Sequence, residues 1–97
     1  MPKMKEAPRS GVRIVRFKVR LPKADEVAIS GDFNQWDPEG IPLHHNGTED
    51  WYVALELPPG VYEYRLRVDG EWTDDPDSVR KVRNPFGSEN SVLIVSP

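Results

Sequence analysis

The sequence predicts an all-β protein, a β-sandwich of about six to eight short antiparallel strands. Apolar and polar residues alternate with period two in several segments, which is the pattern of strands that bury one face. Ten prolines and seven glycines divide the 97-residue chain into short pieces, and none of these pieces has a convincing helical period. A chain of this length suits one domain with a single small core.

The first two predicted strands lie near the start of the chain. Residues 12–21 alternate regularly, and basic side chains occupy the outward face. The inward face consists of Val15, Phe17, Val19 and Leu21. Residues 26–31 form a second strand with Val27 and Ile29 inward. Both patterns predict strands of an antiparallel sheet with one buried face.

Two longer strand patterns follow, separated by Pro58, Pro59 and Gly60. The strand at residues 51–57 turns inward Trp51, Val53, Leu55 and Leu57. The strand at residues 61–68 turns inward Tyr62, Tyr64, Leu66 and Val68. We expect a tight turn between them, in which proline presets the bend and Gly60 adopts a positive φ.

A hairpin and a long loop come next. Asp69-Gly70 is a strong hairpin signal, and residues 71–73 form a short strand after it. Residues 91–95 close the chain as a last strand. The loop from Asp74 to Asn90 exceeds ~12–15 residues, and loops of that length are usually functional or disordered.

Two of the three tryptophans do not fit the inward face of a strand. Trp36 lies in the segment GDFNQWDP, among turn residues that cover an indole ring poorly. Trp72 follows the Asp69-Gly70 turn and has polar neighbours, and Phe86 lies in the loop-like segment NPFGSEN. Loop tryptophans either plug the open end of a sandwich or form a ligand surface, and spacing alone leaves both interpretations open.

A sugar is the ligand whose chemistry suits these residues. A pyranose ring has an apolar C–H face that lies flat on an indole, and hydroxyls around its rim. The matching site is an aromatic platform with hydrogen-bonding side chains at its edge. Candidates for that edge are Arg65, Ser88 and Asn90.

Composition and charge exclude several classes of function. The net charge of −3 and the dispersed basic residues argue against nucleic acid as the main partner. The absence of cysteine excludes disulfides and thiolate metal sites and fits a reducing compartment, so we expect a cytoplasmic protein. No apolar run approaches the ~20 residues of a membrane span. We expect residues 1–10 to be a disordered leader and residues 11–97 to be the domain.

The titratable residues do not predict a catalytic or metal site. The largest carboxylate cluster consists of Asp69, Glu71, Asp74, Asp75 and Asp77. We expect these to be solvated turn residues, because nothing in the sequence sets two carboxylates across a bond at roughly 5–10 Å, as a glycosidase needs. His44 and His45 are adjacent, so on a strand they would point to opposite faces and could not share a metal. We predict no enzyme activity, no metal and no cofactor.

Three blocks of the sequence resemble a known family. They are VAISGDFNQWDP, LELPPGVYEYRLRVDGEWTDDPDS and NPFGSENSVLIV, which match in order and spacing and lie within residues 12–95. The family is carbohydrate-binding module family 48, the early-set glycogen- and starch-binding domains. Within it, the sequence is most similar to the kinase-type glycogen-binding domains of AMP-activated kinase β subunits. The resemblance implies an immunoglobulin-like β-sandwich that binds α-1,4-linked glucans.

The resemblance also implies a set of sugar contacts. They are Trp36, Arg65, Trp72, Phe86, Ser88 and Asn90. The two tryptophans match the family's stacking platform. The arginine replaces a lysine and keeps its charge, although its planar fork is not equivalent to an ammonium. The phenylalanine takes the place of a leucine that pushes through the curve of the glucan, and the serine and asparagine match a threonine and an asparagine that contact it.

Two functions of different kinds remain open. The leading interpretation is a non-catalytic module that binds glycogen, starch or maltooligosaccharides. The alternative is a protein-interaction or regulatory domain, such as a kinase-subunit fragment or the N-terminal packing domain of a branching or debranching enzyme, because exposed aromatics equally suit a protein partner. The basic run Arg80, Lys81 and Arg83 fits a solvated face, and also contact with a partner or with a phosphorylated glucan.

Overall fold

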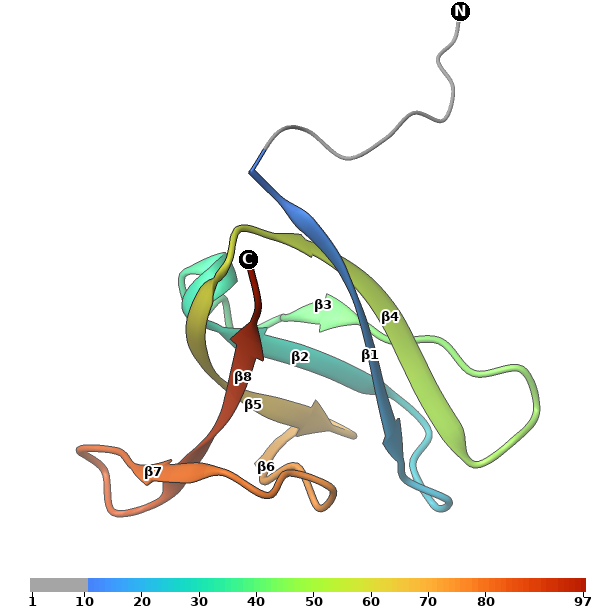
Figure 1. Cartoon of the computed structure of the whole chain (residues 1–97). Helices are drawn as coiled ribbons and strands as arrows, with labels where there is room; N and C mark the ends of the chain where they lie inside the picture. Colours follow the sequence, from blue (N-terminus) through green and yellow to red (C-terminus); the bar gives the residue numbers. More distant parts are fainter. Residues whose placement is uncertain (1–10) are drawn as a thin grey trace, which may run out of the picture.

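The computed structural model describes residues 11–97, and the predicted leader of residues 1–10 lies outside this range. Within it, eight strands form two antiparallel sheets (Figure 1). The smaller sheet pairs β1 (Arg13–Arg20) with β4 (Asp50–Leu57). The larger sheet has the order β3-β2-β5-β8-β7, and β6 pairs with β5 beside this path. Its strands are β2 (Val27–Gly31), β3 (Ile41–Pro42), β5 (Gly60–Val68), β6 (Glu71–Thr73), β7 (Lys81–Arg83) and β8 (Glu89–Val95).

The core lies between the two sheets, and both contribute the inward faces of their strands. Ile29 of β2 and Leu66 of β5 are directly opposite each other and fully buried. From the smaller sheet, Phe17 of β1 packs edge to face with Tyr64 of β5, with 5.4 Å between the ring centroids. Further buried residues are Val19, Val27, Trp51, Leu55 and Leu57. Burial follows the alternation seen in the sequence, and the predicted all-β sandwich is confirmed.

The connection between β4 and β5 differs from the prediction. β4 pairs with β1, whereas β5 pairs with β2 and β8, so the chain crosses from one sheet to the other after Leu57. Gly60 is the first residue of β5 and does not have a positive φ. The predicted tight turn is therefore wrong. Two successive prolines hold φ near −65°, and here they carry the chain onward instead of folding it back.

The predicted hairpin at Asp69-Gly70 is confirmed, and it joins β5 to β6. Both central residues have a positive φ, 53° at Asp69 and 88° at Gly70, as a two-residue type I′ turn requires. The Asp69 carboxylate also accepts hydrogen bonds from the backbone N–H groups of Asp25 and Glu26. These bonds tie the turn to the chain just before β2.

The segment from Asp74 to Asn90 is not one long loop, contrary to the prediction. β7 lies within it and pairs antiparallel with β8, which begins at Glu89. The sequence does not reveal β7, because the three residues of this strand are too few to show a period-two pattern. The segment therefore consists of a connection before β7 and a tight loop between β7 and β8.

Asp75, in the connection before β7, is buried and not solvated. It accepts a 2.5 Å hydrogen bond from the Tyr64 hydroxyl and a 2.8 Å bond from the backbone N–H of Asp77. Burial, together with the Asp75 carboxylate, raises the pKa of Tyr64 well above its usual range. The prediction of a solvated carboxylate cluster is wrong at this position, because Asp75 anchors the connection onto β5.

The described residues contain one short helix, the 3₁₀ helix η1 (Asp32–Asn34) directly after β2. In residues 11–97, no helix has both the length and the apolar character that crossing a membrane requires. His44 and His45 are both exposed.

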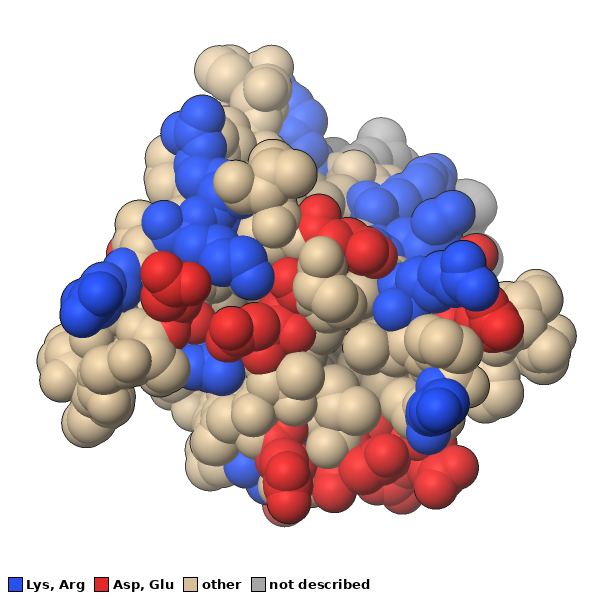
Figure 2. Space-filling model, turned by 90° about the horizontal axis from the view of Figure 1, so that it is seen from below, with Lys and Arg blue, Asp and Glu red and all other residues tan. Residues whose placement is uncertain are grey.

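The surface carries charges of both signs. On the face seen from below, Lys and Arg form several patches separated by Asp and Glu (Figure 2). On the smaller sheet, for example, Lys18 Nζ lies 4.0 Å from Asp50 Oδ2. On this face, the mixture of charges differs from the concentrated positive field with which proteins bind polyphosphate backbones.

Candidate carbohydrate-binding site

A concave site of about 600 Å³ opens beside the outer face of β5, and we call it the aromatic site. The residues that line it are Trp36, Glu63, Arg65, Trp72, Asn84, Pro85, Phe86, Ser88 and Asn90. The structure thus brings all six residues of the predicted site together, and their role as sugar contacts stays a prediction. Glu63, Asn84 and Pro85 were not predicted. The sequence carried a signal for each, because Glu63 shares the outward face of its strand with Arg65, and the other two begin the NPFGSEN segment.

The loop that carries Trp36 begins at a backbone contact that glycine allows. A Cβ at Gly31 would lie 2.3 Å from the Glu63 carbonyl oxygen, so any larger residue would force β2 and β5 apart. The chain then turns through η1, and Gln35 and Trp36 have φ values of 57° and 55°. The left-handed region costs a non-glycine residue roughly 1–2 kcal/mol. Other contacts must therefore hold this turn.

The Asp32 carboxylate is one of those contacts, and it fixes the indole of Trp36. One carboxylate oxygen accepts a 2.9 Å hydrogen bond from Trp36 Nε1. The other accepts a 2.8 Å hydrogen bond from the backbone N–H of Glu63 on β5. Because the indole N–H is already paired, Trp36 offers a ligand the flat face of its ring and not its donor.

Trp72 lies beside Trp36 and completes an aromatic surface. Their ring centroids are 6.3 Å apart, and the ring planes are tilted by 52°. Trp72 is opposite Arg67 in the β5–β6 register, and the Arg67 guanidinium lies 5.0 Å from the Trp72 centroid, over the ring. Trp72 is nonetheless 40 % exposed, and Trp36 is half-buried. Neither indole belongs to the core, which argues against a plug for the open end of the sandwich.

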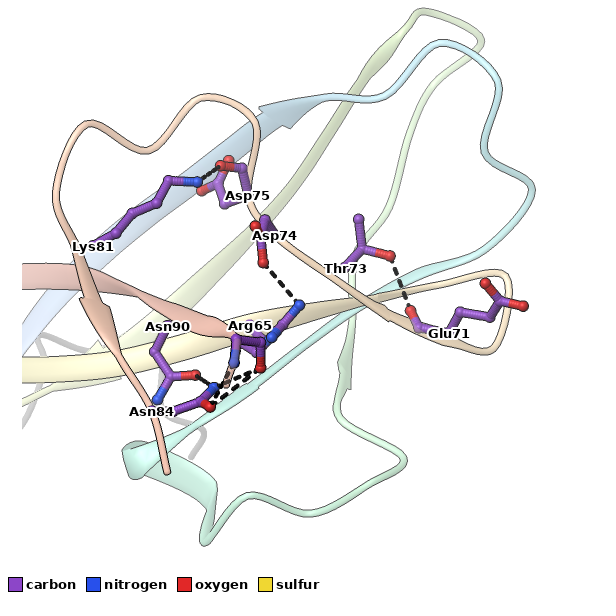
Figure 3. Close-up of polar contacts among 9 residues, drawn as sticks. Arg65, Glu71, Thr73, Asp74, Asp75, Lys81, Asn84 and Asn90 are labelled. Carbon is purple, nitrogen blue, oxygen red and sulfur yellow. Dashed lines mark hydrogen bonds and ion pairs between the residues drawn. The ribbon is translucent and has the colours of Figure 1, made fainter. Parts of the chain in front are cut away.

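Arg65 lies on β5 at the edge of the aromatic site, and its side chain is 14 % exposed. Its Nη2 lies 2.8 Å from Asp74 Oδ1 (Figure 3). Its Nε is buried and has no hydrogen-bond partner within residues 11–97. A buried donor without a partner costs about 1–3 kcal/mol. The pair with Asp74 offsets part of that cost and orients the guanidinium.

The loop between β7 and β8 is shaped by Asn84. Its side-chain oxygen accepts hydrogen bonds from the backbone N–H groups of Phe86 and Ser88, at 3.0 and 3.2 Å. Its amide nitrogen donates to Ser88 Oγ at 2.9 Å. It also donates to Asn90 Oδ1 at 3.0 Å (Figure 3). The amide of Asn90 in turn donates to Glu63 Oε1 at 3.0 Å. These bonds fix the loop onto β5, while Phe86 near its tip is 91 % exposed.

Comparison with known proteins places the chain in a family. Residues 15–97 match the family described as the glycogen recognition site of AMP-activated protein kinase. The chain belongs to this family, and it is a carbohydrate-binding module. The resemblance seen in the sequence is thereby confirmed.

The curated relatives are kinase subunits. The chain is similar to 5′-AMP-activated protein kinase subunit beta-1 of Sus scrofa, with 37 % identity over 70 residues that make up 72 % of this chain and 54 % of that protein. It is also similar to subunit beta-2 of Homo sapiens, with 42 % identity over 72 residues that make up 72 % of this chain and 25 % of that protein. The matched region thus spans about half of one relative and a quarter of the other.

One solved structure with a similar fold belongs to an enzyme. The maltogenic amylase from S. marinus matches with a TM-score of 0.68 and 28 % sequence identity. The match covers 93 % of this chain and 14 % of the amylase chain. This fold therefore also occurs as a small part of a much larger protein.

Proposed function

We propose that this chain binds α-1,4-linked glucans, such as glycogen, starch and maltooligosaccharides, in the aromatic site. The observation that carries the proposal is the meeting of Trp36, Trp72 and Phe86, from three separate segments, around one hollow outside the core. Exposed aromatic rings lower solubility and add nothing to the core, so a ligand surface accounts for them. Glucose units present the apolar C–H faces that such rings cover.

The edge of the aromatic site supports the same ligand class. Sugar hydroxyls both donate and accept hydrogen bonds, and the edge supplies partners of both kinds. Arg65 donates, the Glu63 carboxylate accepts, and the Ser88 hydroxyl does both. Membership in a glycogen-recognition family points to the same ligand.

The proposed function involves no catalysis. Hydrolysis of a glycosidic bond uses two carboxyl groups that flank it. Among the residues that line the aromatic site, Glu63 is the one carboxylate, and it already accepts a hydrogen bond from Asn90. Binding therefore comes from ring stacking and hydroxyl pairing alone.

The proposed setting is a cytoplasmic kinase complex, in which this module is the glycogen-binding part of a regulatory subunit. The support is the 37–42 % identity to kinase β subunits. The similarity to a short part of an amylase favours a second function, namely packing against a catalytic domain in a longer chain. In that case the exposed aromatic face contacts protein and not glucan.

Co-sedimentation with glycogen tests the proposed function. We expect Trp36→Ala and Trp72→Ala to abolish co-sedimentation, because each removes half of the stacking surface. Tyr52→Ala is the matched control, because Tyr52 is 44 % exposed on the smaller sheet, away from the aromatic site. Unchanged co-sedimentation of both tryptophan variants would contradict the proposal. Release of reducing ends from glycogen by the pure protein would contradict its non-catalytic part.

A further inference from the structure

A second hollow, of about 720 Å³, borders the aromatic site, and we call it the polar groove. The two share Arg65, Trp72 and Ser88 in their linings, so they form adjoining parts of one surface. The remaining residues of the polar groove are Thr73, Asp74, Pro76, Arg83, Gly87 and Glu89. It thus lies between the chain that leaves β6 and the hairpin of β7 and β8.

The polar groove differs from the aromatic site in its chemistry. Apart from the shared Trp72 it has no aromatic ring, and it offers hydroxyl, carboxylate and guanidinium groups instead. Arg83 and Glu89 are opposite each other in the β7–β8 register, and both are exposed. A donor and an acceptor that stand side by side suit the neighbouring hydroxyls of a glucose unit, because each hydroxyl both donates and accepts.

The Arg65–Asp74 ion pair lies where the two hollows meet. Arg65 lines both of them, whereas Asp74 lines the polar groove alone. The 2.8 Å contact holds the guanidinium at this border (Figure 3). Thr73 follows Trp72 on β6 and lines the polar groove. A glucan chain that extends from the Trp72 ring into the polar groove therefore comes next to the hydrogen-bonding groups of Arg65, Thr73 and Asp74.

We propose that the polar groove binds the continuation of a glucan chain whose first units stack in the aromatic site. This inference rests on the proposed function. The ligand is an uncharged α-1,4-glucan longer than the aromatic site holds, with Arg83 and Glu89 bound to hydroxyls of the later units. The groove does not suit a phosphorylated glucan, since the carboxylates of Asp74 and Glu89 balance the charges of its two arginines, Arg65 and Arg83.

Isothermal titration with maltotriose and maltoheptaose tests this inference. We expect the wild type to bind maltoheptaose more tightly than maltotriose. In the double variant Arg83→Ala/Glu89→Ala, maltoheptaose affinity falls about three- to tenfold, the size of effect that a few exposed hydrogen bonds give, while maltotriose affinity changes less than about twofold. The matched control is Arg16→Ala/Glu56→Ala on the exposed face of the smaller sheet, which leaves both affinities unchanged.

Amide chemical shifts of the wild type give a second measurement that needs no substitution. We expect the resonances of Thr73, Arg83 and Glu89 to move further with maltoheptaose than with maltotriose when both sugars are at saturation. Unchanged maltoheptaose affinity in the double variant, or an equal loss for both sugars, would overturn the polar groove as a glucan site while the aromatic site still binds. A wild type that binds neither sugar would overturn the proposed function and this inference together.

Discussion

Trp51 of β4 and Trp72 of β6 place the same side chain in opposite settings. Trp51 is 5 % exposed, lies within the core and donates its indole N–H to the Leu21 carbonyl. Trp72 is 40 % exposed, with Arg67 over its ring and Trp36 beside it. Apolar packing holds the core indole, whereas polar side chains at the surface hold the indoles of the aromatic site. The aromatic residues of the core are therefore separate from those that we propose bind glucan.

The largest expected effect comes from removing the core indole. We expect Trp51→Ala to lower the free energy of unfolding by about 3–5 kcal/mol, because it leaves a large cavity in a small core. Trp72→Ala changes that free energy by less than about 1 kcal/mol, as is usual for surface substitutions. Urea unfolding followed by far-UV circular dichroism measures both. Equal destabilisation by the two substitutions would show that Trp72 contributes to folding as much as Trp51 does.

The buried Tyr64–Asp75 pair makes the stability of the folded protein depend on pH. The raised pKa of Tyr64 means that the folded protein holds the phenolic proton more tightly than the unfolded chain, in which tyrosine has a pKa of about 10. The resulting stability is complete below about pH 10 and is lost as the pH rises further, by up to ~1.4 kcal/mol per pH unit. We expect Tyr64→Phe to remove this part of the alkaline decline.

Urea unfolding at pH 9 and at pH 11 measures the pH effect. The quantity of interest is the difference in alkaline decline between the wild type and Tyr64→Phe. Tyr62→Phe is the matched control, because Tyr62 is only partly buried and donates its hydroxyl to the Pro58 carbonyl. An identical alkaline decline in the wild type and Tyr64→Phe would show that the buried phenol is not responsible.

A smaller effect is expected at Asp32, which holds Trp36 without belonging to the lining of the aromatic site. We expect Asp32→Ala to weaken maltoheptaose binding about three- to tenfold, because the indole loses its hydrogen bond and its orientation. The conservative variant Asp32→Asn keeps an oxygen acceptor and restores part of the affinity. The NMR resonance of the Trp36 indole proton reports the hydrogen bond directly. If that resonance moves in Asp32→Ala while the affinity stays the same, the orienting role of Asp32 is excluded.

The smallest expected effect is at Arg67, behind Trp72. A guanidinium over an exposed indole contributes about 0.5–1 kcal/mol. Arg67→Met keeps an aliphatic side chain against the Trp72 ring and removes the charge. We therefore expect maltoheptaose binding to weaken by about twofold to fivefold. Arg16→Met on the smaller sheet is the control, and calorimetric titration is the measurement. A loss as large as that of Trp72→Ala would mean that Arg67 contacts the sugar itself.

Much of the fold could be predicted from the sequence, because local pattern decides it. Alternation places Ile29 and Leu66 inward, and the Asp69-Gly70 pair favours a hairpin through its local backbone conformation. Strand pairing is different, since it depends on contacts between distant residues. The crossing after Leu57 could not be recognised for that reason, and β7 could not be recognised because its three residues are too few to show a period-two pattern.

The candidate site shows the same division. Three aromatic residues in polar surroundings suggest a ligand surface from the sequence alone. The groups that hold them do not, because their roles arise across the fold. From the sequence, Asp32 is predicted to be a turn residue. In the structure its carboxylate also joins the Trp36 indole to the Glu63 backbone. Asp75 is likewise predicted to be solvated, whereas in the structure it accepts a hydrogen bond from the Tyr64 hydroxyl.

We propose that the Trp36–Trp72 surface binds glucan, and a titration of intrinsic tryptophan fluorescence with maltoheptaose tests this proposal. We expect a saturable change in the wild type and in Tyr52→Ala, and its loss in Trp72→Ala with the fold intact. A saturable change that persists in both Trp36→Ala and Trp72→Ala, or no change in the wild type together with no retention on amylose resin, would contradict it.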